Sequence, residues 1–191
     1  MTRTRIYQIL ALLCFLAAAL LLPARAWPQS ADAGEDKPAL PRQFREIVLG
    51  MGLDELKEAL KNDALFNFRG DRDVSYIPVR EENLIETTGP SFIKRAFFQL
   101  RGGSLFIMAF TLNTEMMDHY SVFTDLVKKY GPPSYLDPKE SVWETEEIRI
   151  ALERPLTVKY IDKKAFDDII NESALIQSRR VRQRQEFLDE F

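Results

Sequence analysis

The sequence predicts an α+β fold in which helices pack on a twisted antiparallel sheet and a long helix ends the chain. Three observations support this fold class. The pair Gly102-Gly103 separates two apolar runs, a pattern typical of a tight β-hairpin. Helical periodicity near Leu53 and Thr114 alternates with clusters of short strand-like segments. Residues 162–191 contain neither Gly nor Pro, as a long helix requires.

The composition excludes several classes of function. The chain has 191 residues, of which 46% are hydrophobic, and this is a globular composition. A single Cys excludes an internal disulfide framework, and one Cys with one His argues against a zinc site. With 26 basic and 29 acidic residues, the chain is not a general nucleic-acid binder. We therefore expect no metal, no cofactor and no nucleic-acid partner.

The first 26 residues have the features of an export signal. A positive start precedes the unbroken apolar run 9–22, and the small-x-small pattern Ala24-Arg25-Ala26 follows. A membrane span needs roughly 20 apolar residues. We therefore expect residues 1–26 to be a signal peptide cleaved near Ala26, which places the protein in the periplasm or outside the cell. The alternative is an inner-membrane anchor formed by uncleaved residues 6–22.

The rest of the chain divides into three segments by composition. Residues 27–42 contain three Pro and mixed charge, which is typical of a flexible tether. Residues 43–161 carry the regular patterns of a folded α+β domain. Residues 162–191 form the predicted C-terminal helix. After cleavage near Ala26 the chain would hold 23 basic and 29 acidic residues and would therefore be moderately acidic.

The domain is expected to begin with a short strand at 44–49 and a helix that starts at Leu53. Acidic residues in the first turn stabilise that helix, because the N-terminal end of a helix carries a partial positive charge. Short strands follow at 74–79 and 84–88, the first of them at a sheet edge because it contains Pro78.

The hairpin of 92–101 and 104–112 is the strongest local prediction. In its simplest register, Phe98 lies opposite Ile107 and Phe97 lies opposite Met108. The second strand is apolar on both faces, so we expect it to be central in the sheet, with both faces covered there.

A second helix is predicted over 114–130, with an apolar stripe at spacings of three and four residues. Three strands follow at 141–145, 147–153 and 156–161, where apolar and charged residues alternate in the middle segment. The domain therefore resembles two halves, each built as one helix followed by about three strands.

Asp162 can cap the final helix. Its first half is amphipathic and can dock on the domain, whereas only Val181 is apolar between 177 and 186. We expect this second part to project as a basic arm. The arm offers a contact for an anionic lipid, an acidic protein face or a cell-wall polymer, through Arg179, Arg180, Arg182 and Arg184.

The stretch Ile47-Val48-Leu49-Gly50-Met51-Gly52-Leu53-Asp54-Glu55-Leu56-Lys57-Glu58-Ala59-Leu60 resembles the opening of SmpA/OmlA-type envelope modules. The aromatic strand, Gly-Gly turn and apolar strand from Phe97 to Phe110 are similar to the hairpins of those modules, and the resemblance covers residues 45–112. It implies a small exported α+β protein that binds other envelope proteins without catalysis. The whole chain also resembles exported bacterial proteins of unknown function, which implies no activity.

Two hypotheses for the function follow, and neither includes a catalytic residue. The first is a non-enzymatic cell-envelope interaction or assembly module with an envelope protein as partner. Its binding surface would be the second sheet face together with the arm. The second is a periplasmic carrier that holds a lipid or small apolar ligand between sheet and helices, in a cavity lined by the same residues. An envelope hydrolase is a distant third. The residues expected on the second face are Phe97, Phe106, Met108 and Phe110.

Overall fold

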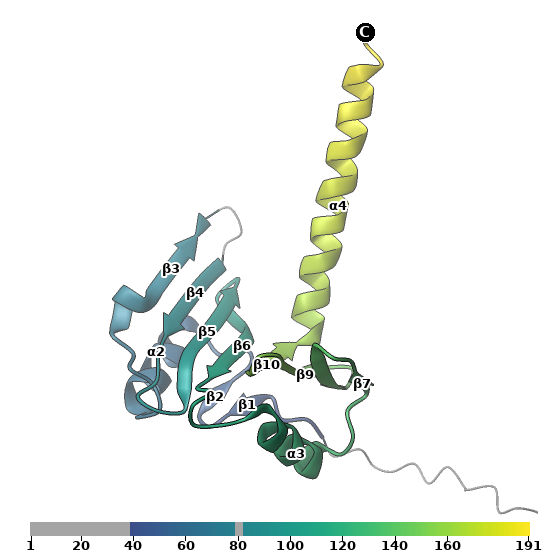
Figure 1. Cartoon of the computed structure of the whole chain (residues 1–191). Coiled ribbons are helices and arrows are strands. Elements are labelled where there is room, and N and C mark those ends of the chain that lie inside the picture. Colours follow the sequence, from purple (N-terminus) through teal and green to yellow (C-terminus); the bar gives the residue numbers. More distant parts are fainter. Residues whose placement is uncertain (1–38, 79–81) are drawn as a thin grey trace, which may run out of the picture. The chain divides into compact units, whose positions relative to one another are not determined.

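The computed structural model describes residues 39–78 and 82–191, which belong to one compact unit (Figure 1). The predicted signal peptide and most of the predicted tether lie outside the described residues. The α+β prediction is confirmed. A two-stranded ribbon of β1 (Gln43–Phe44) and β2 (Ile47–Val48) accompanies an eight-stranded antiparallel sheet with the order β3-β4-β5-β6-β10-β9-β8-β7.

The sheet consists of two four-stranded meanders, each preceded by a helix. Their last strands, β6 and β10, pair antiparallel in the middle of the sheet, so the topology has an approximate two-fold symmetry. Each half has four strands where about three were expected, and the strand that the sequence did not predict is the short first strand of the second half. The first half contains α2 (Leu53–Asn62), β3 (Val74–Ile77), β4 (Glu82–Thr87), β5 (Ile93–Arg101) and β6 (Ser104–Leu112); the second contains α3 (His119–Tyr130), β7 (Tyr135–Leu136), β8 (Glu140–Glu144), β9 (Ile148–Glu153) and β10 (Thr157–Asp162).

One face of the sheet is covered by α2, α3 and the β1-β2 ribbon, as Figure 1 shows. The aromatic residue Phe110 lies in the middle of this core, 1% exposed, with its ring centroid 4.3 Å from that of Phe44 and 5.8 Å from that of Phe98. Complete burial of such side chains contributes about 1.5–3 kcal/mol each. This face therefore provides most of the stability of the fold.

The predicted hairpin is present, but the predicted register is wrong for the residue pairs from Gln99 to Arg95. Leu100 pairs with Leu105, whereas Gln99 pairs with Ile107, so Phe106 is an extra residue in β6. This β-bulge shifts the pairs from Gln99 to Arg95 by one residue, and a second irregularity between Arg95 and Ile93 shifts the ladder back, so that Ile93 pairs with Leu112. Phe98 consequently lies opposite Met108, and Phe97 lies opposite Ala109.

Helix α3 begins five residues later than predicted. The carboxylate of Asp118 accepts a hydrogen bond from the backbone N–H of Ser121 at 2.9 Å, which caps the helix and fixes its start. The buried face is also turned slightly relative to the predicted stripe. The spacing predicts a buried stripe made of Met116, Tyr120, Phe123, Val127 and Tyr130. Instead Val122 and Leu126 are buried, and Tyr120 is 75% exposed.

The long C-terminal helix is confirmed as α4 (Lys163–Leu188). Asp162 caps it by accepting a hydrogen bond from the backbone N–H of Ala165 at 3.1 Å. No residue of α4 is buried, and every residue from Ile170 onward is exposed. Figure 1 shows α4 on the face of the sheet opposite α2 and α3. Among the described residues, none of the helices combines the length and the hydropathy of a membrane span.

Candidate functional site

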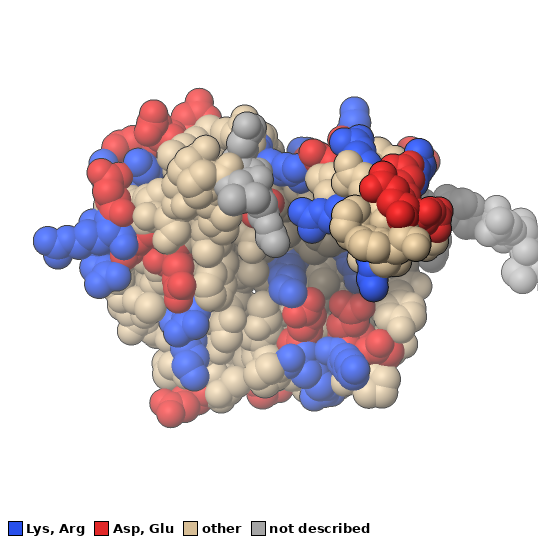
Figure 2. All heavy atoms as spheres, turned by 90° about the horizontal axis from the view of Figure 1, so that it is seen from above, with Lys and Arg blue, Asp and Glu red and all other residues tan. Residues whose placement is uncertain are grey.

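The second face of the eight-stranded sheet carries a groove of about 520 Å³ (Figure 2). We call it the open-face groove. Phe97 of β5, Ile107 of β6 and Phe166 of α4 form apolar parts of its wall, and the short side chains of Ala109 and Ala151 leave its floor hollow. The other lining residues are Leu84, Gln99, Arg149, Glu153, Lys159 and Ile161.

The groove follows from strand alternation and from the bulge. On β9, Ile148, Ile150 and Leu152 point into the core, so Arg149, Ala151 and Glu153 face the other way. On β6 the bulge gives Phe106 no cross-strand partner on β5, and Ile107 lies beside the half-buried Gln99. The guanidinium of Arg95 lies 5.8 Å from the centroid of the Phe97 ring. The apolar side chains of the groove are therefore bordered by polar and charged ones.

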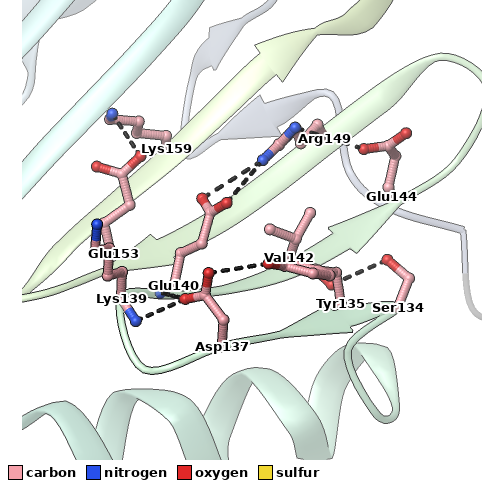
Figure 3. Close-up of polar contacts among 10 residues, drawn as sticks. All are labelled: Ser134, Tyr135, Asp137, Lys139, Glu140, Val142, Glu144, Arg149, Glu153 and Lys159. Atoms are coloured by element: carbon pink, nitrogen blue, oxygen red, sulfur yellow. Dashed lines mark hydrogen bonds and ion pairs between the residues drawn. The ribbon is translucent and has the colours of Figure 1, made fainter.

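Charged residues of the second half flank the groove and pair with one another (Figure 3). Arg149 contacts Glu140 at 3.2 Å and Glu144 at 3.9 Å, and Lys159 contacts Glu153 at 2.6 Å. Arg149, Glu140 and Glu144 also line a second hollow of about 720 Å³, together with Ser134, Tyr135 and Lys163. Partly exposed pairs of this kind contribute about 0–1 kcal/mol each, so a bound partner can replace them at little cost.

Lys163 links this charged region to the start of α4. Its ammonium group donates a hydrogen bond to Glu144, and this bond raises the pKa of Lys163 above the ordinary lysine value. The lysine therefore remains charged over the physiological pH range and helps to hold the first turn of α4 against the edge of the groove.

A different hollow of about 430 Å³ contains His119, Ser141 and Arg154, which are residue types that serve as base, nucleophile and anion contact in enzymes. The Nε2 atom of His119 is buried and has no hydrogen-bond partner among the described residues. Burial lowers the pKa of His119, and the positive charge of Arg154 lowers it further. A nucleophile needs a hydrogen bond to its base, and no such bond joins Ser141 to His119.

Metal chemistry has no obvious donor set in the described parts of the chain, since no three His, Cys, Asp or Glu side chains there are grouped to hold an ion. Ser134, which lines the hollow beside Glu140, donates its hydroxyl to the carbonyl of Val142 at 3.0 Å. That hydrogen bond is structural. The open face thus combines an apolar groove with partly exposed ion pairs.

The bulge separates the four aromatic and Met residues that the sequence placed on one face. Phe97 lines the open-face groove, whereas Met108 and Phe110 belong to the core at 0% and 1% exposure. Phe106 is 4% exposed and lies outside the main core cluster. The predicted shared surface is therefore corrected to a groove with Phe97 as its aromatic member. The four arginines of the arm are all exposed, at positions Arg179, Arg180, Arg182 and Arg184.

A separate apolar cavity of about 260 Å³ lies between α3 and the covered face of the sheet. Val122, Leu126 and Phe110 line it, and Phe92, which is 48% exposed, lies at it as well. Of the residues predicted to line a ligand cavity, it contains Phe110 alone. It is smaller than the roughly 300–1,000 Å³ of most small-molecule sites.

Fold and site together define an α+β domain whose single large antiparallel sheet has one covered face and one open face. The chain belongs to the TP0088 domain family, whose sequence model matches residues 42–172. No curated protein and no solved structure matches the chain. The matched range contains both halves of the sheet and all the groove residues, and it stops within α4, so residues 173–191 lie outside it.

Proposed function

We propose that the protein is an exported, non-enzymatic cell-envelope module that binds an envelope protein in its open-face groove. The main supporting observation is the groove itself. It presents Phe97 and Ile107, both half-buried, beside charged side chains that are already paired with each other. Protein interfaces commonly combine an apolar centre with a polar rim.

Export is the part of this proposal that rests on sequence. The charged start, the apolar run and the small-x-small pattern within residues 1–26 support a cleaved signal, and the SmpA/OmlA resemblance supports an envelope location. N-terminal sequencing of the protein recovered from cells tests it. We expect a chain that begins at Trp27 and fractionates with the periplasm. A chain that retains Met1 and fractionates with the inner membrane would instead support the uncleaved anchor formed by residues 6–22.

A photo-crosslinking amino acid at Phe97 tests the binding surface in living cells. The matched control carries the same amino acid at Glu58, an exposed residue of α2 on the covered side of the sheet. We expect one protein partner to crosslink from position 97 and not from position 58. The purified partner should then bind the chain at a defined stoichiometry and lose affinity for an Ile107→Glu variant. Equal labelling from both positions, or none from 97, would contradict the proposal.

The carrier hypothesis remains a second candidate, because the 260 Å³ cavity is lined mainly by apolar side chains, with Asp125 and Lys129 as its charged members. Its volume suits a single ring or a short acyl chain rather than a whole lipid, since an engineered cavity of about 150 Å³ holds benzene. Mass spectrometry of an organic extract of the purified protein tests it. A ligand that disappears in a Leu126→Phe variant would support a carrier, and a clean extract would argue against it.

A further inference from the structure

Helix α4 and the residues that follow it expose several large apolar side chains. Ile176, Val181, Phe187 and Phe191 are 43%, 65%, 60% and 93% exposed. At 100° per residue, Ile169, Ile176 and Phe187 fall within one narrow stripe, and Arg180 lies in the same stripe. Arg180 and Gln183 stand between Ile176 and Phe187 along this stripe, so it presents two exposed apolar contacts separated by polar side chains. Exposed apolar side chains grouped on one helix face commonly mark an interaction site.

The charges on α4 are segregated into blocks. The sequence runs from an acidic block (Asp167, Asp168 and Glu172) to a basic block at 179–184, and then to a second acidic block at 186–190. A parallel, in-register pair of such helices would place the two basic blocks side by side. An antiparallel pair centred on Ile176 places Arg180 level with Glu172, because each lies four residues from the centre.

We propose that two copies of the chain associate through antiparallel α4 helices, with the two-fold axis passing beside Ile176. This inference rests on the proposed function, because it names a second copy as the partner of the open-face groove. The two Ile176 side chains meet on the axis. Glu172 of each copy then pairs with Arg179 and Arg180 of the other, so every such contact forms twice, as an isologous interface requires.

The same arrangement places the far end of each helix over the groove of the other copy. Phe187 lies eleven residues after Ile176 and is therefore level with Ala165, eleven residues before it. Ala165 adjoins Phe166, which lines the open-face groove. Phe166, near the start of α4, lines the groove, and α4 rises from the face of the sheet opposite α2 and α3 (Figure 1). The end of an antiparallel partner helix therefore points toward the groove, where Phe187 and Phe191 can enter it.

A second copy fits α4 better than a membrane surface does. From residue 163 to 191 the chain has six basic and six acidic side chains, so the helix has no net charge with which to attract anionic lipid. The alternating acidic and basic blocks of α4 instead make the helix complementary in charge to an antiparallel copy of itself. Glu172 already contacts Arg101 of β5, and this contact holds its carboxylate beside the proposed interface.

Analytical ultracentrifugation of the full chain over a range of concentrations tests whether the chain forms a dimer whose two-fold axis passes beside Ile176. We expect a reversible dimer whose dissociation constant rises about 100-fold or more in Ile176→Asp, because the substitution acts in both copies. Leu175→Asp is the matched control, since Leu175 is 66% exposed and lies about 100° away around the helix. That variant should dimerise as the parent does. Equal effects of the two variants would overturn the proposal.

A charge exchange tests the register. The Glu172→Arg chain and the Arg179→Glu/Arg180→Glu chain should each be monomeric, because like charges then meet across the axis. A mixture of the two should form a heterodimer, because every pair is again of opposite sign. Arg101→Ala is the control for the lost contact of Glu172 and should remain dimeric. Failure of the mixture to associate would overturn this register.

The outcomes separate this inference from the proposed function. A monomeric chain that crosslinks from Phe97 to a different envelope protein would overturn the inference and support the proposed function. A monomeric chain without any crosslink from Phe97 would overturn both. A monomer that binds vesicles containing phosphatidylglycerol, and loses that binding in the Arg179→Glu/Arg180→Glu variant, would overturn the inference in favour of a lipid contact.

Discussion

The two faces of the large sheet are built from the same strands and have different properties. On β6, Met108 is fully buried in the core of the covered face, whereas its neighbour Ile107 is half-buried in the open-face groove. On β9, Ile150 is fully buried and Arg149 takes part in the ion pairs of the open face. The comparison shows that one run of apolar residues can provide stability on one side of a sheet and a binding surface on the other.

The largest expected effect is on the covered face. Phe110→Ala removes the ring at the centre of the aromatic cluster and should lower the free energy of unfolding by about 3–5 kcal/mol. Urea denaturation followed by circular dichroism measures the change. The matched variant Phe97→Ala, on the open face, should cost less than half as much, and equal losses would contradict the distinction between the faces.

Adjacent residues of β6 sharpen the comparison. Met108→Ala should lower the free energy of unfolding by about 2–5 kcal/mol, because the vacated core space cannot be filled by water. Ile107→Ala should cost about 1 kcal/mol or less, since part of the side chain already faces solvent, yet it should reduce crosslinking from the groove. A larger loss of stability from Ile107 than from Met108 would show that the register across the bulge is different.

The ion pairs of the open face should contribute little to stability. Arg149→Gln removes the ion pairs with Glu140 and Glu144. We expect it to change the free energy of unfolding by less than about 1 kcal/mol. Thermal unfolding at low and at high salt measures this. A loss of several kcal/mol would mean that these pairs belong to the structural core rather than to an exchangeable surface.

The smallest expected effect concerns His119, which belongs to neither face. Burial and Arg154 lower its pKa in the folded chain below the unfolded value of about 6.5. Its neutral form contributes stability that is fully present above the unfolded pKa and is lost as pH falls through the folded pKa. His119→Gln should remove this slope between pH 7.5 and 5.5 in denaturant titrations. An unchanged slope would assign the pH dependence to carboxylates.

Local sequence patterns predicted the fold class and most elements. The Gly102-Gly103 turn, the Asp162 cap and the alternation on 148–153 each act between near neighbours, and all three are present in the structure. The two-residue strand β7 (Tyr135–Leu136) was missed because it is too short to show any alternation. The start of α3 was placed too early because Met116 continues the apolar spacing beyond the Asp118 cap.

The candidate site was only partly predictable, for a reason that lies in β6. Between Leu105 and Phe110 every residue is apolar, so the pattern cannot reveal a bulge or state which residues face which side. Phe97 was identified, while Ile107, Ala109 and Phe166 were not. The alternation of Arg149 and Glu153 with buried residues was the one available signal of an open polar face, and it was visible in the sequence.

The pairing of β6 with β10 has a consequence for how the chain folds. Within the large sheet, among the described strands, every other pairing joins strands that follow one another along the chain, whereas Ile107 and Ile161 are 54 residues apart. Closing that longer loop costs conformational entropy before any contact compensates for it. Each meander can therefore form early by local hairpin contacts. The folding rate of the whole sheet should then depend on the pairing of β6 with β10.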